Sequence, residues 1–168
     1  MISADRVAQT VERMSAMGPA EMEAIANRMQ SEQPYIMVYM LAVTQGQEFS
    51  DEETETFFFA GAVIWQLMRE NPNGKREITE RILDEADEAN KALMEKVAGD
   101  SAGDFYSVAE TLALDSPEPE VFRYMVETIM EDEEGNPDEP PFSEEHLGAA
   151  FMHLKTVLDA FVAGQKKL

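Results

Sequence analysis

The hydrophobic pattern of the chain centres on residues 56–68, TFFFAGAVIWQLM, where Gln66 is the one strongly polar side chain after Thr56. The stretch is shorter than the roughly 20 apolar residues that cross a bilayer. A helix that is apolar nearly all round lies inside a soluble protein, surrounded by other elements. The pattern therefore predicts a central helix that other helices cover.

The start of this helix carries a strong local signal. Ser50 is followed three residues later by Glu53, the spacing of a capping box, in which each side chain bonds the other residue's backbone N–H. Acidic residues at the start of a helix also interact favourably with its dipole. At the other end, residues 71–74 read Asn-Pro-Asn-Gly, which is typical of a helix stop.

Apolar residues at spacings of three and four predict amphipathic helices along the rest of the chain. The sequence thus favours an all-α fold, a single-domain helical bundle of about 7–8 helices over residues 1–168. The segment 75–98 has a narrow apolar stripe, which we expect to cover either the rest of the domain or a second subunit, and it is predicted to be the longest and most exposed helix. The predicted helical segments are 4–14, 19–29, 34–44, 51–68, 75–98, 105–112, 121–129 and 144–161.

Two parts of the chain resemble each other and suggest an internal duplication. Residues 34–40 align with residues 119–125, and Phe49-Ser50-Asp51-Glu52 aligns with Phe142-Ser143-Glu144-Glu145. This register places Phe58 on Phe151 and predicts that both are buried, with the first copy the deeper one. The predicted halves are 19–71 and 104–163, joined by a connector helix 75–98. The alternative is that two capped helices in an acidic protein share these features by chance.

The net charge of the chain argues against two classes of partner. The chain has 34 acidic and 13 basic residues and a net charge of −21. Binding to nucleic acid or to an anionic membrane depends on Lys and Arg, so neither partner is expected. The acidity is explained by solubility or adaptation to salt, or by an acidic face that docks a partner protein with a basic surface. The chain has no cysteine and its first residues lack the apolar core of a signal peptide, so we expect a cytoplasmic protein.

Motifs of known chemistry are absent from the sequence. The two histidines, His146 and His153, are seven residues apart, too far along one helix to share an ion, and no HExxH motif occurs. Phosphate-binding glycine loops are missing, and the acidic stretch 131–141 does not fit a calcium loop. We therefore assign no catalytic residue, no metal ligand and no cofactor.

Three functional hypotheses follow, in order of preference. The first is a non-catalytic protein that mediates protein–protein interaction and self-associates as a homodimer. The second is a small-molecule binding module with an apolar pocket between helices, lined by Met37, Tyr39 and Trp65. The third is an enzyme that uses buried carboxylates, whose residues need not be adjacent in sequence.

Overall fold

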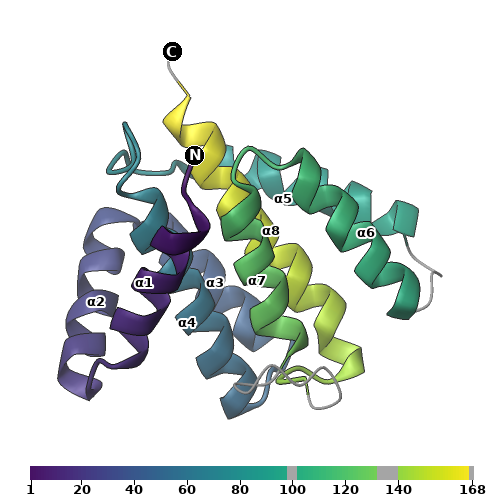
Figure 1. The fold of residues 1–168 in the computed structure, drawn as a ribbon, viewed down its shortest axis with the longest axis horizontal. Coiled ribbons are helices and arrows are strands. Elements are labelled where there is room, and N and C mark those ends of the chain that lie inside the picture. Colours follow the sequence, from purple (N-terminus) through teal and green to yellow (C-terminus); the bar gives the residue numbers. More distant parts are fainter. Residues whose placement is uncertain (98–101, 132–139, 167–168) are drawn as a thin grey trace.

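Two helices, α4 (Asp51–Met68) and α8 (Glu144–Gln165), lie side by side in the middle of the molecule, with their N-termini at the same end (Figure 1). The computed structural model describes residues 1–97, 102–131 and 140–166, and these residues form eight helices and no strand. The other six helices are α1 (Ala4–Ser15), α2 (Pro19–Glu32), α3 (Pro34–Gly46), α5 (Glu80–Val97), α6 (Ala102–Asp115) and α7 (Pro119–Met130). The predicted all-α fold is confirmed. The acidic stretch 131–141 lies mostly outside the described residues.

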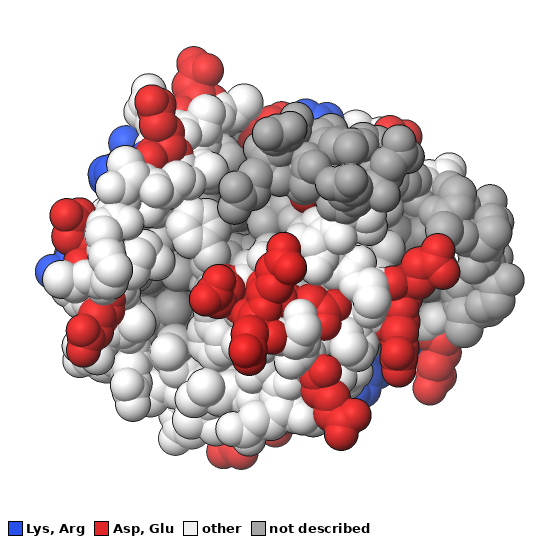
Figure 2. Space-filling view, turned by 90° about the horizontal axis from the view of Figure 1, so that it is seen from below, with Lys and Arg blue, Asp and Glu red and all other residues white. Residues whose placement is uncertain are grey.

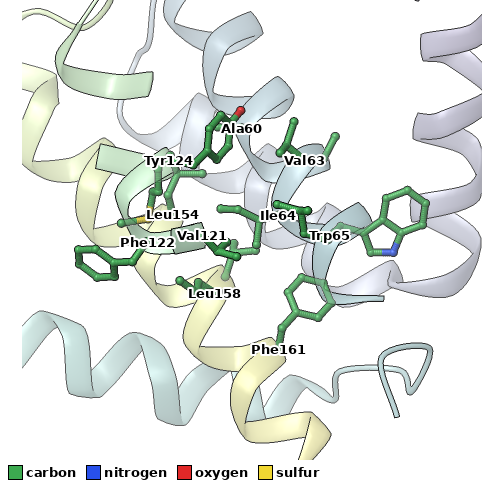
Figure 3. Close-up of a cluster of buried hydrophobic side chains, with 14 of the residues drawn as sticks. Ala60, Val63, Ile64, Trp65, Val121, Phe122, Tyr124, Leu154, Leu158 and Phe161 are labelled. Atoms are coloured by element: carbon green, nitrogen blue, oxygen red, sulfur yellow. The ribbon is translucent and has the colours of Figure 1, made fainter. Parts of the chain in front are cut away.

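The main core is built where α4, α7 and α8 meet. Side chains from the three helices converge there, among them Ile64, Phe122 and Leu158 (Figure 3). Burying a large apolar side chain contributes about 1.5–3 kcal/mol, so this cluster supplies much of the driving force for folding. The predicted central helix, α4, thus shares the centre of the molecule with α8.

The longest helix is α8, with 22 residues, whereas α5 has 18. The expectation that the segment 75–98 is the longest helix is therefore wrong. By length and composition α8 could cross a membrane, but 56% of its most apolar window is buried inside the bundle. The core helix of a soluble protein meets the same test of length and hydropathy.

The predicted connector helix 75–98 begins five residues late. Residues 75–79 are not helical, because Gln33 holds their backbone in another conformation. Its Nε2 donates to the Arg76 carbonyl at 2.7 Å and its Oε1 accepts from the Ile78 N–H at 2.8 Å. Within α5 the buried face also differs from the predicted stripe, since Leu83 and Asn90 are buried and Ala89 is exposed.

The expectation for Phe58 is also wrong. Phe58 is only half-buried, whereas its aligned partner Phe151 is 1% exposed. The adjacent Phe57 is fully buried instead, where it packs edge-on against Phe49 with ring centroids 5.6 Å apart. A run of three phenylalanines does not reveal which ring faces inward, because that depends on the direction of the neighbouring helices.

Packing partners recur along the chain. The helix α1 packs on α4 as α5 packs on α8, and α2 packs on α3 as α6 packs on α7. The residues before α3 and α7, Gln33 and Glu118, have nearly the same backbone angles (φ −134°, ψ 64° and φ −128°, ψ 71°). Under the predicted duplication, α5 corresponds to α1 rather than to a connector. The duplication itself remains a prediction.

One buried carboxylate joins the starts of α4 and α8. Glu53 completes the predicted capping box by accepting from the Ser50 N–H at 2.9 Å, and it also accepts from the Ser143 N–H at 3.0 Å. His146, in the first turn of α8, lies 2.8 Å from Glu53 through Nδ1. Burial opposes ionisation of Glu53, but these hydrogen bonds outweigh it and hold its pKa below the ordinary value of 4.5.

We expect Glu53→Gln to lower the free energy of unfolding at neutral pH by about 2–3 kcal/mol, because it weakens two N-caps and a charged hydrogen bond. Glu52→Gln, an exposed control in the same turn, should cost less than about 0.5 kcal/mol. The native pKa of Glu53 is lowered, so its contribution is complete above pH 4.5 and is lost as pH falls through the native pKa. Urea unfolding from pH 7 to 3 measures this, and equal losses in both variants would contradict the shared cap.

Candidate functional site

The three residues of the predicted apolar pocket have different surroundings. Trp65 is fully buried in α4, and in Figure 3 its indole points away from Leu158 and the rest of the labelled cluster. Its Nε1 has no acceptor among the described residues, and the Arg69 guanidinium covers the ring at 5.4 Å. Met37 and Tyr39 lie on α3, partly buried against the core. The small-molecule hypothesis stays a prediction.

Tyr39 is part of a polar cluster that connects α3, α5 and α8. Its hydroxyl donates to Asp87 Oδ1 at 2.8 Å and lies 2.6 Å from His153 Nδ1. A hydroxyl has a single hydrogen, so the arrangement that satisfies all three groups has neutral His153 donating from Nδ1 to Tyr39. Asp87 is also paired with Lys91 at 2.7 Å. The sequence shows only the Asp87–Lys91 spacing and does not show that Tyr39 and His153 complete the cluster.

Burial dominates the electrostatics of this cluster. It raises the pKa of Tyr39 far above its ordinary value and lowers the pKa of His153 below 6.5. Burial also opposes ionisation of Asp87, but the hydrogen bonds from Lys91 and Tyr39 outweigh it and keep the pKa of Asp87 low. At neutral pH the cluster therefore holds a neutral tyrosine, a neutral histidine and one ion pair. The side chains of the cluster are bonded to one another, and these bonds hold α3, α5 and α8 in position.

A second cluster of polar side chains lies along the interface between α5 and α8. Asn90 donates to Thr156 Oγ1 at 3.1 Å and to Asp159 Oδ2 at 3.0 Å, and its carbonyl accepts from Lys155 at 2.8 Å. Buried polar groups that are fully bonded fix the register of packed helices. This network explains why the face of α5 on α8 contains Asn90 rather than the predicted apolar stripe.

Two carboxylates are buried in the part of the chain that the structure describes, and they lie at opposite ends of α4. Glu53 is in its first turn, whereas Glu118 accepts from the Ile2 N–H at 2.7 Å and from Asn71, which follows the end of α4. Both oxygens of each carboxylate are occupied by donors from the chain. Among the described residues, no group of three His, Asp or Glu side chains is placed to hold a metal ion. The enzyme hypothesis therefore gains no support from these two acids.

An open hollow of about 500 Å³ lies beyond the end of α4 and is lined by residues 69–71 and 73–76. Its cations include Arg69, Lys75 and Arg76. Arg69 is held by Glu32 through two hydrogen bonds of 3.0 and 2.7 Å, and Arg76 donates weakly to the Lys166 carbonyl at 3.4 Å. The hollow is open to solvent, so it does not form an enclosed binding site.

The outer face of α3 is the least expected surface feature. Met40 and Ile36 are fully buried, and the Met40 side chain lies directly against Gly61 of α4, where a larger residue would clash. This contact turns the other side of α3 to solvent. We call that side the α3 outer face. It consists of Tyr35, Val38, Leu41 and Ala42, of which the first three are 42%, 65% and 47% exposed.

Three of the four positions on α7 that align with the α3 outer face are charged, and the fourth, Val126, aligns with Leu41 and is half-buried. Tyr35 aligns with Glu120, Val38 with Arg123 and Ala42 with Glu127. Glu120 and Arg123 form a surface ion pair at 2.6 Å. The exposed side of α7 is thus suited to water, whereas that of α3 is not. Sequence periodicity did not reveal this difference, because α3 is apolar all round and the pattern alone does not say which side is covered.

The helix α3 itself contains no charged residue. Figure 2 looks onto the end of the bundle at which α4 and α8 begin, where acidic side chains gather near the centre. Uncharged surface lies beside and below them, with further acidic side chains along the lower edge of the view. Comparisons with protein-family models, curated proteins and solved structures find no match to this chain.

The cluster around Tyr39 predicts opposite effects of two substitutions on His153. Asp87→Asn should lower the pKa of His153 further, because it removes a nearby negative charge, and Lys91→Gln should raise it by removing a positive one. Because the native pKa already lies below 6.5, protonation of His153 opposes folding, and the free energy of unfolding falls as pH drops below about 6.5. NMR titration of the His153 ring measures the pKa shifts caused by the two substitutions. A change of the same sign in both variants would contradict the arrangement.

Proposed function

We propose that this chain is a non-catalytic protein that acts by binding another protein chain, and that the α3 outer face is its binding surface. The observation that carries the proposal is the exposure of Tyr35, Val38 and Leu41 on a helix that contains no charged residue. A contiguous apolar patch on a soluble protein is typical of an interaction site, whereas single exposed apolar residues are not.

The energetics favour coverage of this face. Val38 and its neighbours are aliphatic or aromatic, and burying such surface contributes about 25 cal/mol per Å². Tyrosine is among the residues enriched at interfaces, because it combines apolar area with a hydroxyl that can bond at the rim. The charged positions on α7 support the same reasoning, since the chain uses ion pairs where a comparable helix faces water.

The face is also held rigidly. The buried side of α3 packs through Ile36, Met40 and Val43, and Tyr39 is tied to α5 and α8 by its two hydrogen bonds. An interaction surface on a fixed helix loses little conformational entropy when a partner binds. The polar cluster around Tyr39 therefore serves the proposed function by positioning the α3 outer face.

Photo-crosslinking tests the proposed function. A photoreactive amino acid is placed at Val38, and a matched variant carries it at Arg123, the aligned and exposed position on α7. After irradiation in the producing cells, we expect protein adducts of discrete mass from position 38 and little from position 123. Equal adducts at both positions, or none at position 38, would contradict the α3 outer face as a binding surface.

A further inference from the structure

The α3 outer face belongs to a larger surface of low charge. Residues 24–47, which span most of α2 and all of α3, contain only Arg28 and Glu32 as charged residues, although 28% of the chain is charged. Glu32 is neutralised by its paired hydrogen bonds with Arg69. In a molecule of net charge −21, this region is nearly neutral.

We infer that the protein that covers the α3 outer face is a second copy of this chain. The inference rests on the proposed function and names its partner. Two molecules with a charge of −21 repel each other wherever acidic surfaces meet. The α2–α3 surface is where two copies approach with few opposed carboxylates. A basic partner, in contrast, would gain electrostatic affinity from the acidic surfaces and no charge–charge attraction from a face that carries no charge.

The shape of the surface favours a two-fold arrangement. Most homodimers have a two-fold axis, which makes the contact self-complementary, and an axis perpendicular to α3 makes the two helices antiparallel. Val38 lies near the middle of the exposed side of α3 and would then contact the second Val38, with Tyr35 near the partner's Leu41. The 13 residues of α3 span about 20 Å. Such a contact is small beside the roughly 800 Å² per partner of a standard interface, so the dimer is weak and depends on concentration.

The salt dependence of association distinguishes a second copy of the chain from a basic partner. The repulsion between two acidic copies is screened as the Debye length falls from about 30 Å at 0.01 M salt to about 3 Å at 1 M. An apolar contact between like-charged copies therefore strengthens with salt. Binding of a basic partner to an acidic surface weakens under the same change.

Sedimentation equilibrium of the purified full chain tests the inference, at about 20 mM and about 0.5 M NaCl. We expect a monomer–dimer equilibrium whose dissociation constant falls as salt rises. Val38→Glu and Val38→Lys should each raise the dissociation constant at least about tenfold at high salt, which corresponds to about 1.4 kcal/mol. The lysine variant lowers the net negative charge, so a loss of association in both variants identifies the face and not the overall charge.

The control is Arg123→Glu on α7, which makes the chain more acidic and leaves the α3 outer face intact. It should associate like the unsubstituted chain at high salt. Val38 and Arg123 are both exposed, so these variants should fold, which circular dichroism and thermal unfolding verify. A chain that stays monomeric at high salt and high concentration would overturn the second-copy inference. So would association that Val38→Glu and Val38→Lys leave unchanged.

The crosslinking result separates this inference from the proposed function. Adducts at position 38 with twice the mass of the chain support both. Adducts of another mass from a chain that is monomeric when purified overturn the second copy and leave the proposed function standing. An absence of adducts at position 38 overturns both.

Discussion

The rest of the structure depends on the carboxylate of Glu53. It accepts hydrogen bonds from the backbone at the starts of both α4 and α8, and His146 closes the same contact from the second helix. The positive ends of two helix dipoles thus share one buried negative charge. Phe49 and Phe142, which precede the two caps, pack with their ring centroids 5.4 Å apart. With the starts of α4 and α8 fixed, the apolar sides of both helices face each other and α7.

The helices α3 and α7, which the predicted duplication aligns, pack differently around this central pair. The helix α7 packs on α1, α4, α6 and α8, and its exposed side carries Glu120 and Arg123. The helix α3 is anchored by Met40 against Gly61 and by Tyr39, and its exposed side is apolar. The two helices, which the predicted duplication would align, thus differ in the character of their exposed sides. The proposed function explains that difference through a partner that covers only α3.

Local signals in the sequence predicted much of the fold. The Ser50–Glu53 capping box and the apolar run 56–68 were enough to locate α4, and helical spacing was enough for the all-α class. Failures came where a distant residue decides the outcome. Residues 75–79 are not helical because the Gln33 side chain bonds to them, and Phe57 rather than Phe58 is buried because of neighbouring helices. The candidate surface was missed for the same reason, since the exposure of Val38 depends on which helices cover α3.

NMR measures most directly whether the α3 outer face meets its own copy. Backbone amide shifts of the ¹⁵N-labelled chain are followed on dilution at about 0.5 M NaCl, where repulsion between copies is screened. The account predicts concentration-dependent shifts centred on Tyr35, Val38 and Leu41, with Arg123 and its neighbours on α7 unchanged. Shifts that are absent, or that centre on another surface, would contradict it.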